Sequence, residues 1–153
     1  MTKTKIRIND DETLRMLIDK EYENSSKSRM CRFAIAVSKH IFRLLKYPLC
    51  DEVKSAFKVN EKWQKNEASV NDARKAAFII HKLAKQSTDP IVSAALRAAG
   101  HAVASAHAKE HAMVAADYAI KVINLYYPDD MEAVKKQRIW QLNKPKEIKD
   151  PKQ

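Results

Sequence analysis

The fold of this chain is decided by the stretch from Pro90 to Ala119, which reads PIVSAALRAAGHAVASAHAKEHAMVAADYA. Twelve of its positions are alanine, the residue with the highest helix propensity. Small side chains also let neighbouring helices approach closely. Because the alanines point to every side of a helix, the stretch predicts a central helix or helix pair that packs on more than one face.

The length of the uninterrupted helical signal predicts that this stretch contains a break. A single helix from Pro90 to Tyr127 would be about 57 Å long, whereas a compact domain of this size has a radius of gyration of about 15 Å. We therefore expect a break between Gly100 and Glu110. Gly100 is the only glycine in the 153 residues, and a glycine inside a helix costs about 1 kcal/mol relative to alanine. We expect the helix to bend there, or another backbone to come close.

Local signals divide the rest of the chain into further helices. Such signals include carboxylates in a first turn, a capping box at Ser69 and Asp72, and a proline directly after the capping residue Asp89. Scarce glycine argues against a many-stranded sheet. The first helix is predicted to begin near Asn9, and another is predicted to begin near Asp89. Three further helices are predicted at Ser28–Lys46, Cys50–Asn66 and Ser69–Gln86. The last predicted helix runs from Asp129 to Asn143.

The expected architecture is an all-α, compact, single-domain bundle of six or seven helices over residues 1–153. The only strand we would allow is a short extension at Lys5–Ile8. Residues 144–153 contain two prolines and are expected to form an extended, frayed tail.

Cysteine use and hydropathy predict a cytoplasmic protein that does not enter a membrane. Cys31 and Cys50 do not form a disulfide framework, and no apolar run of signal-peptide length follows the basic N-terminus. The longest uncharged apolar run, Phe33–Val37, is too short to span a bilayer. Both thiols are expected to be reduced, with Cys31 acting as a small buried hydrophobe.

Several motifs together resemble one bacterial protein family. They are Ser69–Ala77, His81, Asp89-Pro90, Arg97–Ala102, Ala106-His107, Tyr127–Asp130, Arg138–Leu142, Lys46–Pro48 and Trp63. The chain is similar in these segments to the immunity-five-like family of immunity proteins, which is associated with polymorphic toxin systems. The resemblance covers about residues 28–148 and leaves the N-terminal helix, within residues 1–27, outside it. Glu110 stands where the family usually has glycine, so a second close backbone approach is not implied there.

The resemblance implies an all-helical protein that binds and neutralises a toxin. It supplies no catalytic residue, cofactor or named partner. The residues themselves agree, because the sequence contains no Ser/His/Asp order, phosphate loop or paired-carboxylate site. We therefore expect a non-enzymatic binding protein without a cofactor.

The clearest surface signal is a row of basic residues on the predicted helix 28–46. At 100° per residue they fall within an arc of about 100°, and no acidic residue occurs between Asn24 and Cys50. The row is either a solvated face opposite the apolar one or a contact surface for an anionic partner. Solvated faces usually mix charges, because like charges one turn apart repel. The candidate partner-binding residues are Arg29, Arg32, Lys39, Arg43 and Lys46, of which Arg32 and Arg43 are expected to be exposed.

Histidines form the second candidate site. The segment from His107 to His111 reads HAKEH and matches the H-x-x-E-H spelling of a metallopeptidase class. His101 lies near both on a helical wheel. One reading is a metal site with Glu110 as the base; the other is a polar seam of His101, His107 and His111. Only Glu132 and Glu147 remain as downstream glutamate ligands, so we expect the seam without bound metal.

Three functions follow, in order of preference. The first is toxin neutralisation by surface occlusion, with a partner that presents an acidic patch, because the chain carries a net charge of +10 and complementary charge favours association. The second is a small nucleic-acid-associated protein whose basic row contacts phosphates. The third is a metal-dependent hydrolase that uses His107 and His111.

Overall fold

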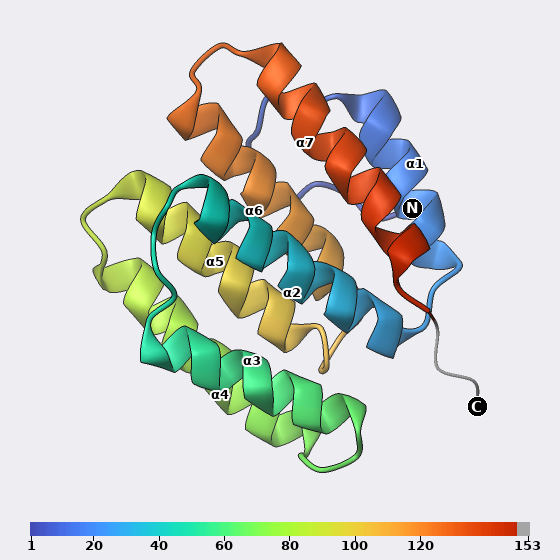
Figure 1. Cartoon of the computed structure of the whole chain (residues 1–153), viewed down its shortest axis with the longest axis vertical. Helices are drawn as coiled ribbons and strands as arrows, with labels where there is room; N and C mark the ends of the chain where they lie inside the picture. The colour runs from blue at the N-terminus through green and yellow to red at the C-terminus, as the bar shows by residue number, and fades with distance from the viewer. Residues whose placement is uncertain (150–153) are drawn as a thin grey trace.

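The computed structural model describes residues 1–149, which form seven α-helices and one short 3₁₀ helix and contain no β-strand (Figure 1). In chain order the elements are α1 (Glu12–Glu23), α2 (Lys27–Leu44), α3 (Asp51–Gln64), α4 (Val70–Gln86), α5 (Pro90–Ala104), α6 (His111–Tyr126), α7 (Met131–Asn143) and the 3₁₀ helix η1 (Lys144–Glu147). The predicted all-α bundle is confirmed, and the strand allowed at Lys5–Ile8 is absent from these residues.

Helices α2, α5 and α6 occupy the centre of the bundle and contact one another. Helices α3 and α4 pair on one side and pack against α5, while α7 packs against α6 and α1 on the other side (Figure 1). The alanine-rich stretch thus supplies the predicted central helix pair, α5 and α6.

Within residues 1–149 no helix is long and apolar enough to cross a membrane.

The core is built where small residues of α5 and α6 meet larger residues of α2. Alanine side chains at the contacts are fully buried because they let the three helix axes approach closely. Phe33, Val37 and Ile41 of α2 fill the remaining space and have no exposed surface. The fully buried alanines of α5 and α6 are Ala95, Ala98, Ala99, Ala102, Ala112, Ala115, Ala116 and Ala119.

The predicted break lies between Ala104 and His111. Ser105 ends α5, where its Oγ donates to the carbonyl of Ala102 at 2.5 Å. Gly100 does not end the helix, because α5 continues through it for four more residues. The capping box of Ser69 with Asp72 and the cap of Asp89 before Pro90 are confirmed.

Both ends of α2 differ from the expected positions. Ser26, not Ser28, caps α2, since its side chain accepts from the N–H of Arg29. The same helix ends at Leu44, and Lys46 takes a positive φ of 54°. Lys46 therefore lies beyond the helix rather than on its face.

The C-terminal segment is folded rather than frayed as far as it is described. Lys144–Glu147 forms η1, and Ile148 packs against the hydrophobic core. Arg29 holds this segment by donating to the carbonyls of Pro145 at 2.6 Å and Ile148 at 2.9 Å. The prediction of an extended tail is therefore wrong for residues 144–148, and the part that concerns residues 150–153 lies outside the described residues.

A buried ion network joins the N-terminal segment to α1, α6 and α7. Arg138 on α7 has no exposed side-chain surface, and its Nη2 lies 2.7 Å from Asp10 Oδ2 and 2.8 Å from Asp117 Oδ1. Arg15 on α1 binds the same Asp117 through two contacts, at 3.0 and 2.9 Å. Asp117 therefore bridges two guanidinium groups in the interior, where each charge depends on its partners.

Further hydrogen bonds complete this network. Gln141 accepts from Nη1 of Arg138 at 2.8 Å and donates to the carbonyl of Ala116 at 3.2 Å. At the other end, Arg15 donates to the carbonyl of Thr2 at 3.1 Å, and Asp19 accepts from the N–H of Thr2 at 2.9 Å. Hydrogen bonds thus satisfy most of the remaining polar atoms around the buried charges, as a buried ion network requires.

Replacing Asp117 by asparagine should destabilise the protein by about 3–5 kcal/mol, because two buried guanidinium groups would lose a shared charge. Asparagine has nearly the same shape, so the effect would report the charge rather than a cavity. Urea unfolding at neutral pH would measure the free energy of unfolding.

The matched control is Asp129→Asn, the same chemical change at an exposed loop residue with a φ of 58°. Asparagine tolerates this left-handed region well, so the control should change stability little. Equal stability of the two variants would show that the network is not a stabilising constraint.

Candidate functional site

The five basic residues predicted to form one contact surface divide into two groups. Arg29 is largely buried, with 17% of its side chain exposed. Besides the carbonyls of Pro145 and Ile148, its guanidinium donates to Ser25 Oγ at 2.8 Å. Arg29 therefore fixes the C-terminal segment and is not available to a partner.

Arg32 has a similar structural position. Its Nη2 donates to the carbonyl of Lys149, and the residue is half-buried. The expectation that Arg32 is exposed is therefore wrong. The C-terminal segment covers the first half of the basic row, and sequence reasoning missed this because it treated that segment as a frayed tail.

The other three cations lie at the C-terminal end of α2 and remain at the surface. Arg43 and Lys46 are exposed. Lys39 is half-exposed, with its Nζ 3.9 Å from Glu61 Oε1 and 5.7 Å from the centre of the Phe57 ring. These three residues line a shallow hollow of 610 Å³ together with Phe42, Tyr47, Pro48 and Leu49.

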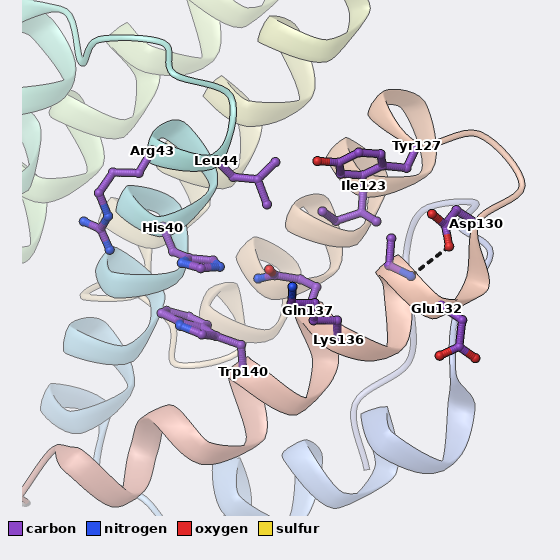
Figure 2. A pocket seen from close by; sticks show the side chains of 11 residues that line it. His40, Arg43, Leu44, Ile123, Tyr127, Asp130, Glu132, Lys136, Gln137 and Trp140 are labelled. Carbon is purple, nitrogen blue, oxygen red and sulfur yellow. Dashed lines mark hydrogen bonds between the residues drawn. The ribbon is translucent and has the colours of Figure 1, made fainter.

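A larger pocket of 780 Å³ lies on the other side of Arg43, between α2, α6 and α7 (Figure 2). His40 of α2 and Trp140 of α7 form one wall, with their rings stacked 3.9 Å apart at an interplanar angle of 14°. Leu44 and Ile123 supply apolar surface, as Figure 2 shows. The remaining lining residues are Tyr127, Asp130, Glu132, Ala133, Lys136 and Gln137.

The pocket and the shallow hollow meet at Arg43, which lines both. Residues of three motifs that carried the family resemblance gather around them. Tyr127 and Asp130 come from one motif and Trp140 from a second, and Lys46–Pro48 is the third. We call this surface the Arg43 face, defined by the residues that line the two hollows.

The pocket contains an acidic group at one end and a histidine in its wall. Asp130 caps α7 by accepting from the N–H of Ala133 at 3.0 Å, so the acidic end of the pocket is the start of that helix. Burial lowers the pKa of His40, the neighbouring Arg43 lowers it further, and Gln137 partly opposes this. His40 is consequently neutral at pH 7, which suits its stacked position against Trp140.

Two of the three histidines of the predicted seam lie together, and a histidine outside that prediction joins them. His101 and His111 lie with their Nδ1 atoms 2.9 Å apart, and the ring of His101 stacks on Tyr118 at 5.4 Å. His81 of α4 joins them, with its ring 4.7 Å from that of His101. His107 is exposed and stays at the edge, 6.3 Å from His111.

Ring-to-ring contacts connect the members of this histidine cluster. Among residues 1–149 no group of three or more His, Cys, Asp or Glu side chains is placed to hold a metal ion. Burial lowers the pKa of His101 to about 3 and that of His81 to about 4. Neighbouring positive charges lower both pKa values further. At His81 the largest of these charge effects comes from Arg97, whose Nη1 lies 3.0 Å from His81 Nδ1.

Gly100 is explained by His81. A Cβ atom at position 100 would lie 2.6 to 2.9 Å from three atoms of the His81 ring, closer than non-bonded atoms tolerate. The close approach expected at Gly100 therefore exists, but a side chain makes it rather than another backbone. Sequence reasoning missed His81 as a member of the cluster because it lies on α4, outside the alanine-rich stretch that contains the other histidines of that cluster.

Cys31 is confirmed as a buried small side chain. It has no exposed surface, and Ser105 Oγ donates to its Sγ at 3.1 Å. Burial raises the pKa of the thiol, so little reactive thiolate forms at neutral pH.

Comparison with known proteins gives one match. The family model described as Imm-5 like putative immunity protein matches residues 20–148. The match begins at residue 20 rather than 28, so it includes the end of α1. Neither the curated proteins nor the solved structures yield a match to this chain.

The buried histidines should make the protein sensitive to mild acid. In the unfolded chain they titrate near 6.5, whereas in the folded protein His81 and His101 titrate near 4 and 3. Below pH 6.5 the unfolded chain therefore binds more protons, so stability should be retained above pH 6.5 and fall progressively as the pH drops toward 4. Urea unfolding between pH 4 and 8 would measure the slope.

A His81→Gln variant should show a shallower pH slope, whereas His107→Gln, at the exposed edge, should keep the slope of the wild type. Identical slopes for all three proteins would contradict the prediction.

Gly100→Ala should destabilise the protein, although alanine favours helices. Overpacking against His81 costs about 1–3 kcal/mol, which exceeds the gain of about 1 kcal/mol in helix propensity. In a His81→Ala background the contact is gone, so the same substitution should become stabilising. A double-mutant cycle by urea unfolding tests this change of sign, and a stabilising Gly100→Ala in the wild type would refute it.

Proposed function

Because the chain belongs to the Imm-5 like putative immunity protein family, we propose that it neutralises a protein toxin by binding it and covering part of its surface. It does so without a catalytic step or cofactor of its own. The Arg43 face is the contact surface, and the partner presents an acidic patch.

The observation that carries this proposal is the composition of the Arg43 face. Two hollows meet at one exposed arginine, and Tyr47, Tyr127 and Trp140 lie around it. Tyr47 and Tyr127 are 46% and 41% exposed, so both rings offer surface that a partner could cover. Arginine, tyrosine and tryptophan are the residues that most often dominate binding energy at protein interfaces.

Charge supports an acidic partner. The chain has a net charge of +10, and Lys39, Arg43 and Lys46 add local positive charge to the face. A nuclease cleft that binds phosphate is itself basic, and juxtaposed like charges cost several kcal/mol. The proposed toxin is therefore not a nuclease that is blocked at its phosphate site.

The rival functions lose support in this structure. Nucleic-acid binding would use the whole basic row, but Arg29 and Arg32 hold the C-terminal segment instead. A hydrolase would need a metal or an acid–base pair. The described histidines pack against each other and Tyr118.

A double variant, Arg43→Glu with Lys46→Glu, should slow association with the proposed toxin partner by about tenfold or more, because electrostatic attraction is lost. Both residues are exposed, so the fold should be retained. For the wild type, raising the salt concentration from 50 to 500 mM should slow association through screening. Stopped-flow or surface plasmon resonance would measure the rates.

The matched control is Lys62→Glu with Lys65→Glu, which changes the charge equally at the end of α3 and directly after it. Its association rate should stay close to that of the wild type. An equal loss in both double variants would mean that net charge, and not the Arg43 face, governs binding.

A further inference from the structure

We infer that the pocket between α2, α6 and α7 binds a carboxylate attached to an apolar or aromatic group, presented by an acidic segment of the toxin. The identification of the partner as a toxin rests on the proposed function. The chemical class of the ligand is argued from the pocket alone.

The first observation is an unpaired donor inside the pocket. Gln137 is only 3% exposed, and its Nε2 has no hydrogen-bond partner among residues 1–149. In Figure 2 its amide end faces His40, with which the Gln137 side chain forms a hydrogen bond that raises the pKa of that histidine. An amide nitrogen carries two N–H donors and no acceptor. A ligand that satisfies the Nε2 of Gln137 must therefore bring a hydrogen-bond acceptor.

The second observation is the charge around the pocket. Arg43 on α2 and Lys136 on α7 are both exposed lining residues. The acidic groups, Asp130 and Glu132, lie together at the start of α7, and Asp130 is engaged in capping that helix. Positive charge is thus available beside Gln137, away from the acidic end. This arrangement favours a carboxylate over a neutral carbonyl as the acceptor.

The third observation is the shape and rigidity of the walls. The stacked rings of His40 and Trp140 form a flat surface, and Leu44 and Ile123 add aliphatic surface across from it (Figure 2). A volume of 780 Å³ lies within the range of sites for small ligands and anchoring side chains. An aromatic ring or a branched aliphatic side chain fits such walls.

These requirements exclude other ligand classes. A pure hydrocarbon would leave the Nε2 donors of Gln137 unpaired, which is unfavourable in a desolvated site. An amine would also face Arg43 and Lys136. A phosphate would satisfy the donors but would not use the apolar walls. An acidic residue beside an apolar one, on the surface of the toxin, meets all the requirements together.

The test uses 3-phenylpropionate as the probe, with nuclear magnetic resonance of the ¹⁵N-labelled full chain. The side-chain NH₂ pair of Gln137 and the indole N–H of Trp140 should shift saturably with the probe. 3-Phenylpropanamide should bind several-fold more weakly, and 3-phenylpropylamine should not shift these signals. No saturable shift with the carboxylate, or equal binding of the amine, would overturn the inference.

Two variants locate the contact. Gln137→Leu removes the unpaired donors, so it should weaken 3-phenylpropionate binding about tenfold while leaving the melting temperature unchanged or higher. Arg43→Gln should weaken the carboxylate but not the amide, and Lys135→Gln, on the same helix outside the pocket, should change neither. Unchanged affinity in Gln137→Leu would overturn the inference even if that variant is fully folded.

Addition of the toxin separates this inference from the proposed function. If the saturating toxin prevents the probe from shifting Gln137 and Trp140, the pocket is the docking point of the toxin. If the probe still binds to the complex, the toxin docks elsewhere and the inference fails. If the toxin does not bind at all, the proposed function fails, and the probe titration alone decides the chemistry of the pocket.

Discussion

The buried interaction between Arg138 and its two aspartates is the constraint on which the rest of the structure depends. Arg138 reaches Asp10 in the N-terminal segment and Asp117 in the central helix α6. These bonds fix both the position and the rotation of α7 on the bundle. Gln137 and Trp140 lie on the same helix, so the orientation of Arg138 toward the interior turns them toward α2. The Arg43 face therefore exists because a charge network elsewhere holds one of its walls.

A buried ion network of this kind selects one arrangement of the helices as well as stabilising the fold. An apolar core of alanine and leucine would allow α7 to rotate or slide, since such contacts are not directional. The guanidinium of Arg138 accepts only an arrangement in which carboxylates meet it in its plane. Arg15 imposes the same condition on α1 through Asp117. Two arginines thus specify how the outer helices sit on an alanine-rich centre that would otherwise tolerate several packings.

The sequence could predict the features that depend on residues close in the chain. The capping box at Ser69, the start at Asp89-Pro90 and the break after Gly100 all depend on local signals, and the structure contains each of them. The fold class followed from alanine content and scarce glycine. The candidate site was predicted only in part. Arg43 and Lys46 are exposed, but the capture of Arg29 and Arg32 by the C-terminal segment depends on contacts more than a hundred residues apart. The approach of His81 to Gly100 and the burial of Arg138 are likewise tertiary events that no spacing along the chain indicates.

The ion network also makes the docking of the outer helices interdependent. Asp117 shares its charge between Arg15 of α1 and Arg138 of α7. A variant that lacks α7 would keep Asp117 with one of its two arginines and would leave Asp10 without Arg138. Such a variant would bury charge without its full set of partners, which costs stability, and it would be more open to proteases.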